Sequence, residues 1–293
     1  METKLRETAK KLLEEKKVDV VIGYGRRPVG GVGAVFVTTP EDVSRLVWND
    51  ECQQNLAVYL TRKEARKLGR PAVVVKGCDA RSVVVLANES QIDREAMVVI
   101  GMTCTGVRQK RSGGTDLETP AKCEVCVSHN PKYVDIVIGE AVEEQEFSES
   151  ELATKGKYAK LAQLLAKPES ERLAWWKNEF SRCIKCYACR QSCPLCYCNE
   201  CVAEKNRPVR IDPSASSAGN FAWNVTRAFH LAGRCVGCGN CTSACPAGID
   251  LDLLNLTCAL AAQKEFGFVA GSEPGAAPLI GSWSEEDKED FIR

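Results

Sequence analysis

Eight cysteines fall into two runs whose spacing indicates iron–sulfur chemistry. Each run has the pattern C-x2-C-x2-C-x3-C-P. Three thiolates at this spacing can hold three corners of a 4Fe-4S cube from one short stretch of backbone, and the fourth cysteine of each run ligates the cluster of the other run. The proline that ends each run cannot continue a hydrogen-bonded turn. The ligands are Cys183, Cys186, Cys189 and Cys193 in the first run, and Cys235, Cys238, Cys241 and Cys245 in the second.

We therefore predict two clusters that exchange their fourth ligands. One cluster is assigned to Cys183, Cys186, Cys189 and Cys245, and the other to Cys235, Cys238, Cys241 and Cys193. Zinc is the main alternative, because zinc sites also use cysteine pairs separated by two residues. Zinc does not explain three cysteines at successive spacings followed by Cys-Pro, twice in one chain. A disulfide framework explains the pattern less well still.

A second thiolate site is predicted in the N-terminal half. Cys78 and Cys104 each follow a short run of Val and Ile by a turn that contains glycine, and Cys123 and Cys126 form a C-x2-C pair. Ligands of open α/β sheets lie outside the carboxyl ends of the strands, where two of these cysteines are expected. The four cysteines therefore predict a four-thiolate site. Separate buried thiols and a zinc site are the alternatives.

Hydrophobic periodicity predicts the elements that position these cysteines. Residues 2–16 carry apolar side chains at helical spacing, and short runs rich in Val and Ile are typical of strands buried on both faces. Helical patterns between several of the runs indicate an α/β domain with a mainly parallel sheet over residues 1–145. Strands are predicted at 18–23, 34–39, 72–75, 97–100 and 133–138, and helices after Pro40, at 56–68 and at 83–86 with Asp79 as its cap.

The remainder of the chain is expected to be helical around the two cysteine runs. We predict a helical linker at 146–181, an α-helical dicluster ferredoxin-like domain at 182–265 and an extended tail at 266–293. Within these segments, helices are predicted at 158–166, 169–181, 224–233 and 250–265. Leu173, Trp175, Trp176 and Phe180 either dock the two domains or form a core stripe, and the tail carries Trp283, Phe291 and Ile292.

Composition limits the partners and the cellular location. The 293 residues have a formal net charge of zero, so nothing indicates a nucleic-acid partner. No signal peptide opens the chain, and no apolar run approaches the length of a membrane span. Seventeen cysteines without a secretory signal are expected to be reduced thiols that serve metal. We therefore expect a cytoplasmic protein with no membrane insertion.

Five cysteines exceed the twelve assigned ligands. Cys52 is expected to be a structural thiol, and Cys258 has no assigned role. Cys196, Cys198 and Cys201 follow the first run closely and are either free thiols beside the clusters or ligands of a further metal.

The N-terminal half resembles the FrhB/FdhB family, the beta subunits of deazaflavin-coenzyme-reducing hydrogenases and formate dehydrogenases. The resemblance covers residues 30–142 and rests on GAVFVTT, VVVKGCDARS, VIGMTC and CEVC-x6-YVDIVIGE. It places Cys78, Cys104, Cys123 and Cys126 on the family's cysteine positions and implies a 4Fe-4S cluster beside an FAD. The family word GTPCQ is replaced here by residues 76–80, KGCDA, and the dicluster domain replaces the long segment that follows in the hydrogenase subunits.

The candidate FAD-binding residues are Gly30, Gly31 and Gly33, in a glycine-rich loop predicted at 23–33, together with Lys76. The alternative for this loop is an ordinary connection between strands. The basic stretch at 108–111 is expected to be a solvated loop or to meet an anionic cofactor or partner.

The sequence holds no nucleophile–base constellation and no Walker motif. The stretches CIKCYACRQSCP and HLAGRCVGCGNCTSACP resemble iron–sulfur subunits that accompany heterodisulfide-reductase-like, hydrogenase and formate dehydrogenase modules. The resemblance implies an electron-transfer subunit of a multisubunit anaerobic oxidoreductase, with three 4Fe-4S clusters, that relays electrons between such modules. The alternatives are a flavin-containing catalytic beta subunit that exchanges electrons with a two-electron carrier, and a structural zinc scaffold.

Overall fold

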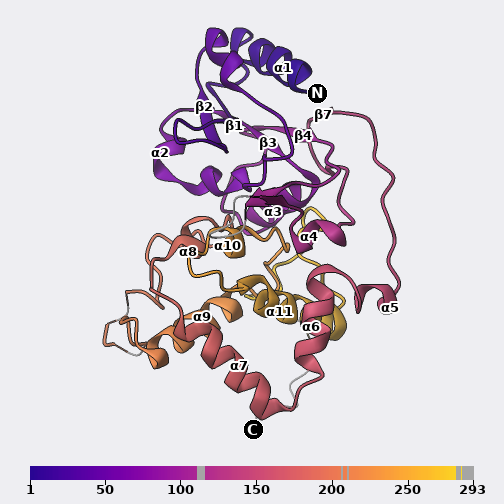
Figure 1. Cartoon of the computed structure of the whole chain (residues 1–293). Helices are drawn as coiled ribbons and strands as arrows, with labels where there is room; N and C mark the ends of the chain where they lie inside the picture. The colour runs from indigo at the N-terminus through magenta and orange to yellow at the C-terminus, as the bar shows by residue number, and fades with distance from the viewer. Residues whose placement is uncertain (111–115, 206, 210, 282–284, 286–293) are drawn as a thin grey trace.

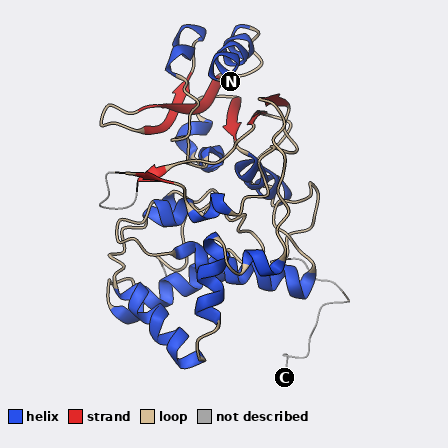
Figure 2. Cartoon of the chain, turned by 45° about the vertical axis from the view of Figure 1, so that its right-hand side comes forward, coloured by secondary structure: helices blue, strands red, loops and turns tan. Residues whose placement is uncertain are grey.

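The computed structural model describes residues 1–110, 116–205, 207–209, 211–281 and 285, so the predicted tail hydrophobes Trp283, Phe291 and Ile292 lie outside the described residues. A strand-containing N-terminal region lies at one end of the molecule and a helical region at the other (Figure 1). Turning the molecule shows the same separation, with strands in the upper part and helices below (Figure 2). None of the described helices is long and apolar enough to span a membrane.

The N-terminal region is built on a five-stranded mixed sheet of order β2-β1-β3-β4-β7. The strands are β1 (Val20–Arg26), β2 (Val32–Val37), β3 (Pro71–Val75), β4 (Val98–Met102) and β7 (Ile136–Ile138). β1, β3, β4 and β7 run parallel, and β2 pairs antiparallel with β1 at the edge. The prediction of a mainly parallel sheet is confirmed. A second, two-stranded sheet joins β5 (Gln109–Lys110) and β6 (Leu117–Glu118). Only β5 falls within the basic stretch 108–111, which was predicted as a solvated loop or a contact to an anionic cofactor or partner.

The predicted glycine-rich loop is wrong over most of its length. Gly23 and Gly25 lie in β1 and Gly33 lies in β2, which leaves only a short hairpin turn between the strands. A Cβ at Gly23 would stand 2.4 Å from the Leu46 side chain, and one at Gly25 would stand 3.0 Å from the Arg45 carbonyl oxygen. These two glycines therefore allow Leu46 and Arg45 to pack closely against the strand, and they do not form a flexible loop.

Helices of the N-terminal region cover the sheet. α1 (Glu2–Glu14) buries the predicted face of Leu5, Ala9, Leu12 and Leu13. The helix predicted after Pro40 is a 3-10 helix, η1 (Pro40–Arg45), and the continuous helix predicted at 56–68 is split into η2 (Leu56–Thr61) and α2 (Lys63–Arg66). The split falls at Arg62, whose backbone is extended. The ambiguous stretch 83–86 is helical, as expected, within α3 (Gly77–Asn88).

The helical region surrounds the two cysteine runs. Its elements are α4 (Ala121–Glu124), α5 (Glu149–Leu152), α6 (Gly156–Leu165), α7 (Glu169–Ser181), α8 (Ala188–Gln191), α9 (Ser217–His230), α10 (Asn240–Ser243) and α11 (Leu251–Phe266). Phe180 is fully buried and stacks on Trp176 with ring centroids 5.3 Å apart, in one apolar cluster with Trp223. Leu173 remains 44% exposed. These aromatics thus form the core stripe of the helical region and do not dock the two regions.

The two regions share one apolar core. Six buried residues of the helical region belong to the same cluster as the sheet and its helices, namely Cys193, Leu195, Leu231, Val236, Cys238 and Ala270. The Arg234 guanidinium lies 2.6 Å from the Glu89 carboxylate, which also accepts a hydrogen bond from the Tyr197 hydroxyl. After α11 the chain returns to α3, where Arg81 donates to the Ala270 carbonyl oxygen at 2.7 Å. The start of the predicted extended tail is therefore docked on the N-terminal region.

We expect Leu231→Ala to destabilise the sheet as well as the helical region. Leu231 is 2% exposed and belongs to the shared core, so its truncation should lower the free energy of unfolding by about 2–5 kcal/mol. Leu173→Ala, at an exposed position, is the control and should cost no more than about 0.5 kcal/mol. Urea denaturation gives both values, and hydrogen exchange of the β3 amides reports on the sheet. Unchanged protection of β3 in Leu231→Ala would contradict a shared core.

Candidate metal centres

Four cysteines of the N-terminal region line a single cavity of about 100 Å³. Cys78 lies in the first turn of α3 directly after β3, and Cys104 follows the end of β4. Cys123 lies in α4, and Cys126 follows that helix in the loop that leads to β7. The structure thus brings together the four residues that the sequence predicts as one site, at the carboxyl ends of two adjacent parallel strands.

Backbone groups orient two of these thiols. The Gly106 amide donates to Cys104 Sγ at 3.4 Å, and the Ser128 amide donates to Cys126 Sγ at 3.5 Å. The Cys104 amide donates to the His129 carbonyl oxygen at 3.0 Å, which ties the loop after the C-x2-C pair to the end of β4. Amide hydrogen bonds to sulfur are a recurrent means by which proteins set the potential of iron–sulfur clusters.

Positive charge surrounds the cavity, whose lining includes Lys76, Arg81, Lys122 and Lys157. Burial raises the pKa of the Cys78 thiol well above its usual range, with Lys122 and Lys76 acting in the opposite direction. Burial also raises the pKa of Cys104 and of Cys126. A bound metal removes this cost, because it takes the thiolate directly and adds its own positive charge. The basic lining fits the anionic thiolate cluster that these residues would hold.

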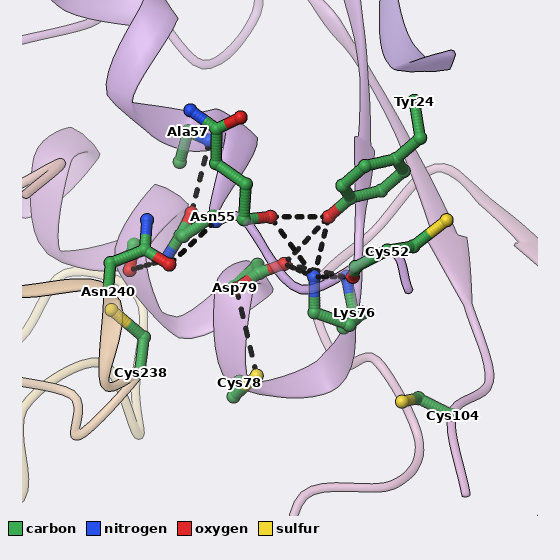
Figure 3. A network of polar contacts seen from close by, with 12 residues as sticks. Tyr24, Cys52, Asn55, Ala57, Lys76, Cys78, Asp79, Cys104, Cys238 and Asn240 are labelled. Carbon is green, nitrogen blue, oxygen red and sulfur yellow. Dashed lines mark hydrogen bonds and ion pairs between the residues drawn. The ribbon is translucent and has the colours of Figure 1, made fainter. Parts of the chain in front are cut away.

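A buried ion pair lies beside this site (Figure 3). Lys76 is 1% exposed, and its ammonium lies 2.6 Å from the Asp79 carboxylate. The same ammonium donates to the Tyr24 hydroxyl at 2.5 Å and to the Cys52 carbonyl oxygen at 2.9 Å. Burial lowers the pKa of Lys76, but Asp79 and the Cys78 thiolate outweigh it and raise the pKa overall. Lys76 is therefore held as a cation at the base of the cysteine cavity.

Asp79 also corrects the predicted start of α3. The N-cap residue of α3 is Lys76. Asp79 lies three positions further on, in the first turn, and its carboxylate accepts a hydrogen bond from the Lys76 backbone amide at 3.4 Å. The sequence predicted the helix and a capping role for Asp79. It did not predict that Asp79 would lie inside the first turn and bond back to the N-cap residue. Asp79 thereby fixes the turn that carries Cys78.

Asparagines extend this network to the second cysteine run (Figure 3). The Asn55 backbone amide donates to Asn240 Oδ1 at 3.1 Å, and Asn55 Nδ2 donates to the Ser82 hydroxyl at 2.8 Å. Asn240 in turn donates to the Ser192 carbonyl oxygen at 3.0 Å, next to the end of the first run. The helix that carries Cys78, the first cysteine run and the second cysteine run are thus held together by the hydrogen bonds of two buried asparagines.

The structure does not bring the candidate FAD residues together. Gly30 and Gly31 form the exposed turn of the β1–β2 hairpin, with φ values of 89° and 72°, and Gly33 lies in β2. None of these glycines lines the cysteine cavity, and the ammonium of Lys76 is engaged by Asp79. Sequence reasoning missed a larger cavity of about 680 Å³ that contacts Cys104. Its lining includes Thr103 and Gly139, which follow the strands β4 and β7.

The two cysteine runs fold in the same way. Cys189 lies in α8 and Cys241 in α10, and each short helix starts after a residue in the left-handed region, Tyr187 and Gly239, with φ values of 58° and 69°. Lys185 and Gly237, at corresponding positions, also have positive φ values. Non-glycine residues seldom adopt this conformation, so two of them in the first run indicate a backbone shaped to wrap a ligand.

The environment of the thiols agrees with exchanged fourth ligands. Burial raises the pKa of Cys189 to about 11, and the thiolates of Cys183 and Cys245 add to this rise. The hydrogen bond with Cys196 and burial raise the pKa of Cys193, and Cys238 of the other run contributes. Cys245 packs in one apolar cluster with Cys183, Cys189 and Cys241, and Cys193 packs in another with Cys235 and Cys238.

Helix α9 presents unpartnered donors to this region. Trp223 Nε1 and Arg227 Nε are buried and have no hydrogen-bond partner among the described residues. Trp223 packs in one apolar cluster with Cys189 and Cys241, and Arg227 donates to the Cys189 carbonyl oxygen at 3.2 Å. Buried donors without partners are costly, and the sulfurs of a cluster would satisfy them. The residues present fit two iron–sulfur clusters.

The additional cysteines occupy different environments. Cys52 is fully buried, as expected of a structural thiol, and burial raises its pKa to about 11. A hydrogen bond between Cys196 and Cys193 lowers the pKa of the Cys196 thiol to about 6. Cys198 is exposed, and Cys201 and Cys258 are half-buried. The described contacts assign no ligand role to these thiols.

We expect Asp79→Asn to be strongly destabilising. The substitution leaves the Lys76 ammonium buried without its counter-charge, which typically costs about 3–5 kcal/mol in the free energy of unfolding. Asp42→Asn is the matched control, since Asp42 pairs with Arg45 at the surface at 3.7 Å, and such pairs contribute about 0–1 kcal/mol. Chemical denaturation of both variants provides the comparison. Equal stabilities would show that Asp79 does not hold Lys76 as a buried cation.

Comparison with known proteins finds similar sequences for both regions. The family model described as a 4Fe-4S dicluster domain matches residues 179–249, which contain both cysteine runs. The chain is 24% identical to the F420-dependent formate dehydrogenase subunit beta of Methanocaldococcus jannaschii, with 92% of each chain covered. It is 26% identical to the F420-dependent formate dehydrogenase 1 subunit beta of Methanococcus maripaludis, over 66% of this chain and 71% of the relative.

Proposed function

We propose, from the premise that this is an FdhB-like chain with a 4Fe-4S dicluster domain, that it is the three-cluster electron-transfer subunit of a multisubunit oxidoreductase. The observation that carries the proposal is the meeting of Cys78, Cys104, Cys123 and Cys126 at one basic cavity. This set would hold the third cluster, beside the two of the dicluster domain. The third cluster and the two dicluster clusters would belong to different segments of the chain. The proposed segments are 1–145, 146–181, 182–265 and 266–293.

The position of the cavity gives the order of the relay. Val236 and Gly237, which lie between Cys235 and Cys238, form part of its lining. The N-terminal site is therefore adjacent to the cluster assigned to Cys235, Cys238, Cys241 and Cys193. The cluster assigned to Cys183, Cys186, Cys189 and Cys245 would follow, and the exposure of Cys186 supports an exit for electrons at the surface.

The chain's own residues set the conditions for transfer. Thiolate-held clusters supply one-electron chemistry in which the charge is spread over the cube. The buried cations, the amide donors to sulfur and the apolar packing decide how readily an electron is accepted at each site. Electrons would enter from a hydrogenase, formate dehydrogenase or flavin module at one end and leave to a heterodisulfide-reductase-like module at the other, in the cytoplasm.

A catalytic flavin subunit is the second candidate function. The cavity of about 680 Å³ beside Cys104 favours it, because its size is within the range of cofactor pockets and it contacts a candidate cluster ligand. A flavin bound there would exchange electrons with a two-electron carrier and pass them singly to the N-terminal cluster. FAD content of the purified protein distinguishes this function from a relay that receives electrons from a neighbouring subunit.

The relay is tested by Cys104→Ala. We expect iron to fall by about four atoms per chain, one cubane, while the dicluster domain with its own eight ligands keeps its spectrum. Electron transfer through the complex should drop steeply, and a dye that reacts at the dicluster domain should still be reduced. Cys258→Ala, in α11 and outside all three ligand sets, is the control and should keep its iron. Unchanged iron and unchanged turnover in Cys104→Ala would refute the N-terminal cluster.

A further inference from the structure

One basic side chain at each junction of the proposed three-cluster relay donates to a carbonyl oxygen of a cysteine ligand. Of the basic side chains that line the N-terminal cavity, Lys122 also donates to the second run. Arg227 lies at the second junction and donates to the first run. Neither residue belongs to a cysteine motif, and no sequence pattern pointed to either. The inference that follows rests on the proposed function and deepens it.

Lys122 contacts both sides of the first junction. It lines the cavity with Cys78 and Cys123, and its ammonium donates to the carbonyl oxygen of Cys238 in the second run. One ammonium group therefore contacts parts of the chain that carry ligands of two different clusters.

Arg227 has the same relation to the second junction. It is 6% exposed on α9 and donates to the carbonyl oxygen of Cys189, a ligand of the first run. Its Nε atom is buried without a partner among the described residues. Trp223, one turn earlier on α9, packs in one apolar cluster with Cys189 of the first run and Cys241 of the second. The guanidinium is thus placed where the two ligand sets of the dicluster domain meet.

We propose that Lys122 and Arg227 are positioning residues that raise the reduction potentials of the two clusters flanking each junction and allow neighbouring clusters to be reduced together. Each transfer moves one electron from a reduced cluster to its oxidised neighbour, without bond formation or proton release. The added negative charge disfavours a second electron nearby, and this repulsion is strong where water is excluded. A fixed cation between the clusters offsets the repulsion on both sides.

The two residues should act on different pairs of clusters. Lys122→Gln keeps a donor for the Cys238 carbonyl oxygen and removes the charge, so it should lower the potentials of the N-terminal cluster and of the adjacent dicluster cluster. Arg227→Gln should lower both dicluster potentials and leave the N-terminal cluster unchanged. We expect each affected cluster to show at least a tenfold fall in its reduced-to-oxidised ratio at fixed potential, about 59 mV for a one-electron couple.

The experiment is a redox titration of the full anaerobic protein with dithionite, followed by electron paramagnetic resonance at low temperature. The signal of the N-terminal cluster is identified as the one lost in Cys104→Ala. Lys160→Gln is the charge control, since Lys160 pairs with Asp250 at the surface at 3.1 Å and should leave all potentials unchanged. Lys122→Arg and Arg227→Lys keep the charge and should restore the wild-type potentials.

The outcomes separate this inference from the relay itself. Full iron content with unchanged potentials in both glutamine variants would overturn it, as would an equal shift of every cluster. Loss of a cluster in a glutamine variant, with the cluster kept in the variant that retains the charge, would support the inference. Loss of a cluster in both variants of one residue would assign that residue a purely structural role and overturn the inference. A wild-type protein with two clusters would refute the three-cluster relay and the Lys122 prediction, and Arg227→Gln would still test the second junction.

Discussion

A thiolate buried away from water is unstable unless positive charge lies beside it, and this constraint shapes the molecule. Cys189, Cys193, Cys238 and Cys241 are buried, and Cys78 lines the N-terminal cavity. Burial raises the pKa of the Cys78, Cys189 and Cys241 thiols, so as free groups these three would stay protonated. The interior supplies the compensation through Lys76, Lys122 and Arg227, and through the metal that the ligand sets fit.

The same constraint explains why the two regions share one core. A hydrogen bond forms only between groups in contact, so ligand sets that are joined by hydrogen bonds must be packed against one another. Asn55 and Asn240 join the N-terminal sheet to the second run, and Leu231 and Val236 complete an apolar core begun by β1 and β3. The Glu89–Arg234 ion pair and the return of residues 268–275 to α3 close the same junction on its outer side. Packing and electrostatics therefore depend on one interface, which the proposed route for electrons would cross.

The sequence was sufficient for features that local spacing determines. The α1 face, the mainly parallel sheet and the helix after Cys78 follow from periodicity, and the dicluster domain follows from two cysteine runs. It was insufficient where long-range packing decides. Gly23 and Gly25 suggested a loop because strands disfavour glycine, but contacts from Leu46 and Arg45 require glycine there. Lys76 looked available to an anionic cofactor, since nothing local reveals its burial beside Tyr24 and Asp79. Lys122 and Arg227 carry no motif, because only the fold brings them between the ligand sets.

The most direct test of the account is to locate iron in crystals of the anaerobically purified protein by anomalous diffraction at the iron absorption edge. The account predicts three separate iron peaks per chain. One lies in the cavity lined by Cys78, Cys104, Cys123 and Cys126, next to Val236 and Gly237, and two lie between the cysteine runs, with Arg227 between them. Two peaks confined to the dicluster domain, with the N-terminal cavity free of iron, would contradict it.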